Sequence, residues 1–445
     1  MKSYTLKPMD LNLNDEFDVI VAGGGPAGCA AAIAAARKGA KTLLIEASGC
    51  LGGMGTIGLV PAWCPFTDKE KIIYKGIAEE IFLESLKGVP HNKEGCYDWV
   101  PINPEYLKRL YDEKVIGAGA KVLFNTMISS VDADGENINT IIVSNKAGLS
   151  AYKAKVYIDC TGDADLCYWA GVPMLPAEED DGYQPATHCF EISNVNMKSF
   201  EESEWLHPHN PNSPIYDILK SGKYNIPDSH MCQNEVYKGT VGFNAGHIWD
   251  VDNTDPECVS NALIEGRKLA YEIHKALVEF VPQTFAESSL SHTAPAMGIR
   301  ETRRVECDYV LTVDDYLARK TFEDEICRNC YYIDVHHKAS EVKLVNDCKI
   351  DYKERDKRYE PGESHGIPYR CLTPKGLKNV LVAGRSISTE RQLQGSTRVM
   401  PVCLAMGEAA GKAAVLAIKQ ENIDVHGIDV GELRRQIIED GGYIK

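Results

Sequence analysis

The chain has 445 residues, of which 44% are hydrophobic and 25% are charged, and its formal net charge is -16. This composition is close to that of an average globular protein and excludes a disordered or fibrous chain. The acidic excess disfavours a nucleic-acid partner or an anionic membrane surface, because both are bound through Lys and Arg. The length allows two or three domains of about 150 residues each.

Two further properties of the whole chain bear on its location. Residues 1–17 contain no apolar core of the kind found in signal peptides, and no later stretch offers an uninterrupted apolar run long enough to span a bilayer. The fifteen cysteines are odd in number and scattered, which is typical of reduced thiols rather than of a disulfide framework. We therefore expect a cytoplasmic protein without a membrane partner.

The pattern at residues 18–58 is typical of a dinucleotide-binding unit. A short apolar run at residues 19–22 predicts a buried strand, and Gly23, Gly25 and Gly28 follow it at the spacing G-x-G-x-x-G. The first glycine permits a tight turn, the second lets the backbone approach a pyrophosphate, and the third lets the next helix pack on the strand. The pyrophosphate would then bind at a helix N-terminus.

The next elements complete this unit. An alanine-rich helix is predicted over residues 29–38, and a second buried strand over residues 41–45 ends at Glu46. This acid follows Gly28 by about the distance at which such folds place a carboxylate on the ribose hydroxyls, and it disfavours a phosphorylated ribose. Glycine turns without any ligand are common, but the agreement of strand, glycines, helix and acid favours a dinucleotide over an ordinary βαβ unit.

Two helices and several short strands are predicted next. One helix is expected over residues 74–86, and a second begins at Pro104, is capped by Asn103 and ends near residues 117–119. Short β-like runs with turn signals between them predict a small antiparallel meander, at residues 121–125, 128–132, 138–144 and 155–158.

An inserted domain is predicted in the middle of the chain. Residues 157–166 form a strand that breaks at Thr161-Gly162 and returns the chain to the first sheet. From about residue 171 to residue 350, proline-rich connections and alternating hydrophobicity then predict a separate sheet domain. Its expected elements are two alternating runs and one long helix, at residues 186–192, 239–244 and 256–280.

The inserted domain contains an arginine cluster. Arg300, Arg303 and Arg304 lie close in sequence to Glu301 and Glu306. Such clusters are commonly salt-bridged or solvated. Alternatively, the guanidinium groups clamp a carboxylate, a phosphate or a cofactor oxygen.

The last third of the chain again shows the pattern of a buried strand, a glycine and a helix of small residues that is found at residues 18–58. A buried strand is predicted over residues 377–383, followed by Gly384 and Arg385, and Pro401 begins an apolar helix rich in small residues. The N-terminus of this helix is a favourable position for negative charge.

Taken in order, these motifs resemble a known family. They resemble the FAD-dependent oxidoreductases of the two-dinucleotide-binding-motif flavoprotein superfamily, and within it a bacterial group related to fumarate reductase flavoproteins and heterodisulfide reductase flavin subunits. The motifs are DVIVAGGGPAGCAAA, GCLGGMGT, IDCTGDADL, GIRETRR, HGIPYRCLTPKGLKNVLVAGRSIS and GSTRVMPVCLAMGEAAG.

The resemblance implies a fold and a cofactor. The expected fold is α/β, with a Rossmann-like, glutathione-reductase-like FAD-binding domain at residues 15–170 and 351–445. A mixed β-sheet and α substrate domain is inserted at residues 171–350. The implied FAD-binding residues are Gly23, Gly25, Pro26, Ala27, Gly28, Glu46, Gly52, Gly53, Met54, Thr161, Gly162, Asp163, Gly384 and Arg385.

Only one complete glycine-turn unit is found in the sequence. A protein that reduces its flavin through its own NAD(P)H domain would show a second one. We therefore expect hydride exchange between the flavin and a small organic substrate, at a C–O or C–C bond, with an external electron donor or acceptor. The alternative is a flavin electron-transfer subunit that needs a partner protein. An RNA-modifying flavoenzyme is disfavoured by the acidic charge, and a homo-oligomer is compatible with the sequence.

Proton transfer beside a flavin needs an acid or a base. The predicted catalytic residues are His247, Arg398 and Tyr369, and His188 and Arg370 are further candidates. His247 lies in the expected substrate domain, and Arg398 immediately precedes the helix that faces the flavin. Each of these residues could equally be structural.

Five cysteines are candidates for a metal-binding or redox role. Cys327 and Cys330 have the spacing of half a zinc or redox site, with Cys307 and Cys348 nearby in sequence. No second C-x-x-C is present, so ordinary thiols are favoured and no metal site is predicted. Cys50 lies beside the glycines of the flavin loop, where packing explains it as well as chemistry.

Overall fold

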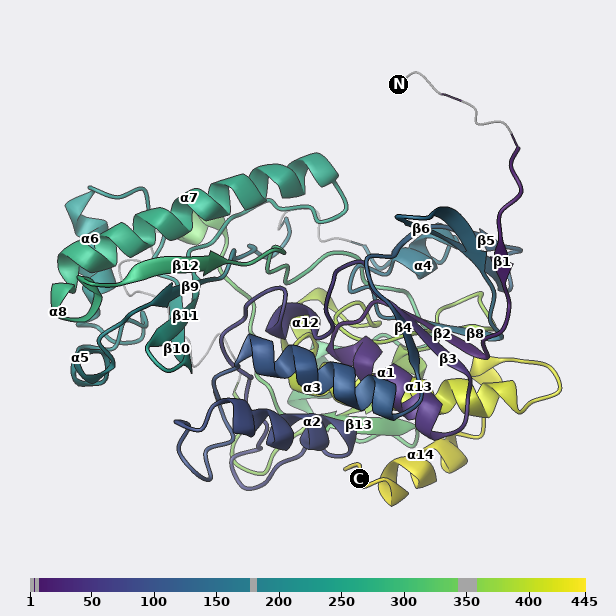
Figure 1. Ribbon diagram of the computed structural model, residues 1–445. Coiled ribbons are helices and arrows are strands. Elements are labelled where there is room, and N and C mark those ends of the chain that lie inside the picture. The colour runs from purple at the N-terminus through teal and green to yellow at the C-terminus, as the bar shows by residue number, and fades with distance from the viewer. Residues whose placement is uncertain (1–3, 5–7, 177–181, 343–357) are drawn as a thin grey trace.

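A five-stranded parallel sheet forms the centre of the computed structural model, which describes residues 4, 8–176, 182–342 and 358–445 (Figure 1). The strand order is β15-β8-β2-β3-β4. Every neighbouring pair is parallel, which confirms the predicted α/β fold class with a Rossmann-like sheet. The strands are Val19–Ala22 (β2), Thr42–Ile45 (β3), Lys121–Leu123 (β4), Val156–Asp159 (β8) and Val380–Val382 (β15).

The sheet is buried on both faces. In β2, Val19 and Val21 belong to the core on the helical side, whereas Ile20 and Ala22 belong to the core on the opposite side. This two-sided burial explains why the strand is a continuous apolar run rather than an alternating one. Helices α1 (Pro26–Arg37) and α13 (Met400–Ile418) share the helical side with α2 (Ile77–Ser85) and α3 (Pro104–Gly117).

Helices α1 and α13 pack at very short range. A Cβ atom added to Gly407 would lie 2.1 Å from the carbonyl oxygen of Ala27, and one added to Gly411 would lie 2.3 Å from that of Ala31. Both distances are far below van der Waals contact, so only glycine fits at these two positions. The small residues of both helices therefore bring the C-terminal segment directly onto the first βαβ unit.

The predicted antiparallel meander is partly wrong. Its outer members, residues 121–125 and 155–158, lie in the parallel sheet as β4 and β8. The meander consists instead of β5 (Met127–Ala133), β6 (Ile138–Asn145) and β7 (Gly148–Tyr152), with β1 (Leu13–Asn14) pairing to β7. Short apolar runs look alike whether they are half buried or fully buried, so the pattern could not assign residues 121–125 to a sheet. The strand predicted from residue 157 onward overlaps β8 and does return the chain to the parallel sheet.

A second antiparallel sheet lies on the other side of the molecule (Figure 1). Its order is β10-β11-β9-β12, and the long helix α7 (Pro256–Phe280) packs on one face with Phe190, Ile192 and Phe243. We call this unit the cap. Its elements are β9 (Phe190–Ser193), α5 (Met197–Glu202), α6 (Pro214–Ser221), β10 (Met231–Tyr237), β11 (Thr240–Ala245), α7, α8 (Pro282–Phe285) and β12 (Ser289–Thr293).

The remaining described elements connect these layers. β13 lies within the predicted residues 171–350, yet it pairs with β14 from the C-terminal part. The domain boundaries stay predictions, and the second one falls outside the described residues. These elements are η1 (Gly53–Gly55), η2 (Leu86–Gly88), α4 (Asp165–Trp169), α9 (Val313–Leu317), β13 (Glu325–Asn329), η3 (Ala339–Glu341), β14 (His365–Pro368), η4 (Tyr369–Cys371), α12 (Arg391–Thr397), η5 (Val425–Gly427) and α14 (Val430–Glu439).

One helix among the described residues, α13, is long and apolar enough to cross a membrane by length and composition alone. In the structure, 89% of its most apolar window is buried inside the protein. Its two charged residues, Glu408 and Lys412, pair with each other at 2.6 Å. Its apolar character is therefore accounted for by packing in the core.

We predict that Gly407→Ala destabilises the protein by about 1–3 kcal/mol, because the new methyl group collides with the backbone of α1. The measurement is the free energy of unfolding in urea. The matched control is Gly117→Ala at the end of α3, where a Cβ would meet nothing within 4 Å. That control should be neutral or stabilising by about 0.5–1 kcal/mol. Equal effects of the two substitutions would contradict the packing argument.

Candidate functional site

In the glycine turn after β2, two glycines pack closely against backbone atoms and a third borders free space. A Cβ on Gly23 would lie 2.5 Å from the carbonyl oxygen of Cys160, and one on Gly28 would lie 1.8 Å from that of Gly23. A Cβ on Gly25 would meet nothing within 4 Å, and Gly25 caps α1 without any side-chain hydrogen bond. The start of α1 therefore has free space and a positive dipole end, which suits a pyrophosphate.

A carboxylate lies beside this turn. Glu46 follows β3, and its two oxygens accept hydrogen bonds from the backbone N–H groups of Gly24 at 2.6 Å and Ser48 at 2.7 Å. The backbone therefore fixes the carboxylate next to the glycine turn, the position expected for a contact with ribose hydroxyls.

The loop at residues 52–54 closes against the same turn. The N–H of Gly52 donates to the carbonyl oxygen of Gly24 at 2.8 Å, and a Cβ on Gly53 would lie 3.0 Å from Cα of Gly25. Gly52 has φ of 101°, which side-chain-bearing residues rarely adopt. Met54 follows and lines the cavity described below.

Asp163 connects three distant parts of the chain. Its Oδ1 accepts from Arg385 at 2.8 Å and from the Thr302 hydroxyl at 2.6 Å, and its Oδ2 accepts from Asn253 at 2.6 Å. Burial alone would raise the pKa of this carboxyl group, but Arg385 and these hydrogen bonds lower it below its usual value. Arg385 also donates to the carbonyl oxygen of Gly162 at 2.8 Å.

Thus the structure brings together the residues that the sequence motifs singled out for FAD. Gly384, with φ of 103°, places its Cα close to α1, since a Cβ there would lie 3.3 Å from that of Ala27. Five separate segments meet around the start of α1, which combines free space, helix N–H groups and a nearby carboxylate. These features fit a dinucleotide.

A cavity of about 570 Å³ opens between these segments and the cap. Met54, Arg385 and Met400 line it on the side of the glycine turn, and β10 and β11 line it on the side of the cap. The cap strands alternate, so Phe243 packs under α7 while Asn244 faces the cavity. Aromatic side chains add apolar surface to its wall: Trp99, Trp205, Tyr331 and Tyr332.

Four arginines line the cavity: Arg300, Arg358, Arg385 and Arg398. Arg300 is buried, and its Nη1 donates to the carbonyl oxygen of Pro185 at 2.6 Å and to the Thr187 hydroxyl at 2.8 Å. No carboxylate forms an ion pair with Arg300 within the described ranges, and burial lowers its pKa to about 10. Arg398 pairs with Asp334 at 3.2 Å, but its buried Nε has no hydrogen-bond partner there.

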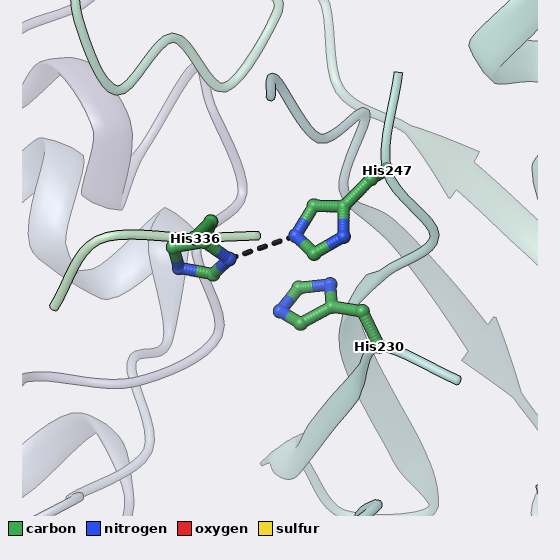
Figure 2. A group of neighbouring side chains, drawn as sticks. All are labelled: His230, His247 and His336. Carbon is green, nitrogen blue, oxygen red and sulfur yellow. Dashed lines mark hydrogen bonds between the residues drawn. The ribbon is translucent and has the colours of Figure 1, made fainter. Parts of the chain in front are cut away.

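Four histidines meet at the cap side of the cavity. His247 is buried, and its Nδ1 lies 2.5 Å from Asp228, while its Nε2 lies 2.8 Å from Nδ1 of His336 (Figure 2). Burial lowers the pKa of His247 to about 4, although Asp228 opposes this shift. Burial also lowers the pKa values of His230 and His336 well below the usual range. The fourth histidine, His337, contacts Asp228 at 3.1 Å.

Other predicted candidates lie elsewhere. Tyr369 is buried away from the cavity, and its hydroxyl donates to the carbonyl oxygen of Val425 at 2.7 Å. The ring of His188 is hydrogen-bonded to the carbonyl of Ala294, and Arg370 pairs with Asp324 at the surface. The structure therefore places only His247 and Arg398 of the catalytic candidates at the cavity.

The three arginines of the cluster have separate partners, and the described cysteines form no disulfide. Arg303 pairs with Asp165 at 3.0 Å, and Arg304 donates to backbone carbonyls, so only Arg300 of the three lines the cavity. The described cysteines are free thiols, and Cys348 lies outside the described residues. Burial raises the pKa of both Cys327 and Cys330, so the thiolate forms are disfavoured.

Several residues at or beside the cavity are not among those predicted from the sequence: Asp228, His230, His336 and His337. The His336-His337 pair was visible in the sequence, but these positions follow no known ligand spacing. Only the folded chain brings them together with His247.

Comparison with known proteins agrees with the glycine-turn geometry. Residues 18–437 match the model of a family described as FAD dependent oxidoreductase. The digeranylgeranylglycerophospholipid reductase of Methanocaldococcus jannaschii is 32% identical over 295 residues, covering 64% of this chain and 64% of that relative. The thiamine thiazole synthase of Methanococcus aeolicus is 32% identical over 34% of this chain and 56% of its own length. The chain thus spans less than two thirds of the length of either relative.

Among solved structures, a geranylgeranyl bacteriochlorophyll reductase-like protein from Thermoplasma acidophilum covers 97% of this chain and 85% of its own. Its TM-score is 0.48 and its sequence identity is 13%.

We predict that Asp163→Asn destabilises the protein by about 3–5 kcal/mol, because it leaves the buried charge of Arg385 without its partner. The control is Asp217→Asn on α6, whose side chain is 74% exposed and whose loss should change stability by less than about 0.5 kcal/mol. Urea unfolding of both variants is the measurement, and an unchanged midpoint for Asp163→Asn would contradict the assigned role.

Proposed function

The chain belongs to the family of FAD-dependent oxidoreductases, and on that premise we propose that its flavin exchanges hydride with a small organic substrate bound in the cavity. The single observation that carries this proposal is the position of the cavity, between Met54 and Arg385 on the cofactor side and the cap on the other. FAD, once bound, supplies a carrier that accepts or gives a hydride.

We assign the cofactor contacts to this chain's own groups as follows. The backbone around Gly23 and Gly25, with the first turn of α1 at Pro26, Ala27 and Gly28, would hold the pyrophosphate. Glu46 would take the ribose hydroxyls. The flavin end would be held by Gly52, Gly53, Met54, Thr161, Gly162, Asp163, Gly384 and Arg385. This assignment is supported by the free space at Gly25 and by the convergence of these segments.

The start of α13 supports the same orientation. Met400 lines the cavity, and the helix begins there without a side-chain cap. The positive end of the helix dipole would therefore face the flavin and favour negative charge on its reduced form.

We propose that the substrate carries an anionic group. Arg300 is buried and forms no ion pair with a carboxylate among the described residues, and Nε of Arg398 has no hydrogen-bond partner there. The cavity is therefore locally cationic in a protein of net charge -16. Arginine binds a carboxylate or phosphate through paired, charge-assisted hydrogen bonds. The aromatic wall would cover an apolar body, and His247, oriented by Asp228, would face the reacting end of the substrate.

Reduction of an isoprenoid C=C bond is a second candidate function, because the archaeal relatives are named digeranylgeranylglycerophospholipid reductases. The lining of histidines and arginines favours a shorter, more polar substrate than a pair of long isoprenoid chains. The finer relationship to fumarate reductase flavoproteins and heterodisulfide reductase subunits stays a prediction.

Electrons would come from, or go to, an external partner. Among the sheets of the described residues, only β15-β8-β2-β3-β4 is wholly parallel, and its glycine turn is the one that we assign to FAD. This supports direct turnover at the flavin without a dedicated NAD(P)H domain. The electron-transfer-subunit alternative makes a distinct prediction, since no small molecule would then reduce or reoxidise the flavin. The cytoplasmic location and self-association also remain predictions from the sequence.

We predict that Gly25→Ala weakens FAD binding at least tenfold while the protein remains folded. The methyl group would occupy the space beside the start of α1, where the backbone conformation of Gly25, with φ of -70°, also suits alanine. Fluorescence titration of the apoprotein with FAD measures the affinity, and thermal unfolding of the apoprotein checks the fold. Unchanged FAD affinity would refute the placement of the pyrophosphate.

The function itself is tested by anaerobic flavin spectroscopy. The purified holoenzyme is mixed with matched pairs of anionic and neutral compounds: hydroxy acids with their esters or amides, and, after dithionite reduction, enoates with theirs. Bleaching by hydroxy acids, or reoxidation by enoates, supports the proposal. If none of the compounds reacts while dithionite still reduces the flavin, a partner-dependent subunit is favoured instead.

With a reacting anionic compound in hand, Arg300→Gln should raise its KM by roughly 10–100-fold, the loss of a charge-assisted interaction of about 1.5–3 kcal/mol. The neutral partner of the pair should be little affected. Arg398→Gln provides a second variant if Arg300→Gln folds poorly, and Arg370→Gln is the surface control. A KM that rises equally for charged and neutral compounds would exclude recognition of the anion.

A further inference from the structure

Three histidines from separate segments meet at the wall of the cavity. His230 immediately precedes β10 and His247 follows β11, and the pairing of Met231 with Ala245 brings them to the same end of the hairpin. His336 comes from the loop after β13, which lies outside the cap. Figure 2 shows the three imidazole rings grouped together. We call these three residues the histidine cluster.

The ring nitrogens lie at distances that suit a shared ion. One nitrogen from each ring lies within 4.8 Å of the other two, and Nε2 of His247 lies 2.8 Å from Nδ1 of His336. The ring of His230 stacks on that of His247 at 4.0 Å, and its Nδ1 is buried without a hydrogen-bond partner. Such an unsatisfied nitrogen in a buried position is costly unless something binds there.

Two of the three rings have a carboxylate near the nitrogen that points away from the shared space, and one of these carboxylates is within hydrogen-bond distance. Asp228 lies 2.5 Å from Nδ1 of His247, and Asp334 lies 3.7 Å from Nε2 of His336. In each ring the other nitrogen is the one that faces the shared space. This arrangement of a carboxylate, an imidazole and an open nitrogen is typical of metal-binding histidines, whose second nitrogen donates to a carboxylate.

A neighbouring group of three residues helps to position the histidine cluster and does not form a second metal site. Asp228, His247 and His337 also lie close together. The carboxylate of Asp228 already lies between the two rings, at 2.5 Å from His247 and 3.1 Å from His337. Asp228 therefore pairs with both rings, and Nε2 of His337, which makes no hydrogen bond among the described residues, still contacts this carboxylate. Nδ1 of His230 has no hydrogen-bond partner in the described part of the chain.

We propose that His230, His247 and His336 bind one divalent transition-metal ion, with Zn²⁺ as the best match. Three neutral imidazoles suit Zn²⁺, Cu²⁺, Ni²⁺ or Fe²⁺, and three protein ligands leave a coordination position open, as in catalytic zinc sites. That position faces the cavity, because all three histidines line it. A substrate oxygen or a water molecule would fill it.

Small movements are enough for coordination. Tetrahedral zinc with Zn–N bonds of about 2.0–2.1 Å separates its nitrogen ligands by about 3.3 Å. The hydrogen bond between His247 and His336 would therefore be exchanged for two metal bonds, with the nitrogens moving apart by about 0.5 Å. The proton of His336 would then reside on Nε2, facing Asp334, and the ring of His230 would tilt toward the ion.

The local charges permit this binding. Arg300 and Arg398 line the same cavity and oppose a second cation, but Asp228 and Asp334 lie behind the ligands and offset them. Burial disfavours the charged forms of the three rings, which leaves their lone pairs available. With a metal bound, His247 acts by holding the ion that faces the substrate, and not by carrying a proton.

The test is a metal titration of tag-free, full-length protein, first treated with a chelator and dialysed. Calorimetry with Zn²⁺ should show one equivalent per chain. His230→Ala and His336→Ala should each weaken binding more than about 100-fold. Asp228→Asn should weaken it by about 10–100-fold, as expected for a carboxylate that positions a ligand.

Matched controls separate this result from misfolding. His292→Ala removes a cap histidine that is 69% exposed and lies outside the cluster, and it should bind Zn²⁺ like the parent. FAD content and melting temperature are measured for every variant. The absence of stoichiometric binding, or an unchanged affinity in both His230→Ala and His336→Ala, would overturn the proposal. Because this experiment measures metal affinity, its outcome does not depend on whether any substrate reduces the flavin.

Discussion

The close contact between α1 and α13 is the constraint on which the rest of the structure depends. Because glycine stands at positions 407 and 411, the backbone of α13 reaches the carbonyl oxygens of α1. This contact fixes the C-terminal segment on the first βαβ unit, although hundreds of residues separate them in sequence. It also places the start of α13 beside the glycine turn, so that two helix N-termini point toward one region. The inserted cap is then held over that region.

Asp163 joins the cap to this base. Its carboxylate accepts hydrogen bonds from Arg385 on the cofactor side and from Asn253 and Thr302 on the cap side. A buried carboxylate is stable only when donors satisfy it, so the cap must be in place for this charge to be tolerated. The same contacts keep Arg385 at the edge of the cavity. One residue therefore joins the cap side to the segment that we assign to the flavin end of the cofactor.

The cavity concentrates polar groups that would be costly in an ordinary core. Arg300 is buried without a described carboxylate partner, and His230 keeps an unpartnered nitrogen. Buried polar groups that lack a hydrogen-bond or ion-pair partner are typical of functional sites, where a bound ligand supplies the missing contacts. An anion for the arginines and a metal ion for the histidines are mutually compatible, since a metal-bound substrate oxygen and a distant carboxylate or phosphate can belong to one molecule.

The sequence by itself determined the glycine turn after β2, because Gly23, Gly25, Gly28 and Glu46 lie within one βαβ unit and act through the local backbone. It also determined helix starts such as Asn103-Pro104, where the cap is a local hydrogen bond from the Tyr106 N–H. It could not assign β4 to the parallel sheet, since short apolar runs do not reveal their partners. Only the tertiary structure decided which histidines meet. His230, His247 and His336 come together through strand pairing and a distant loop, and no local pattern records contacts made across the fold.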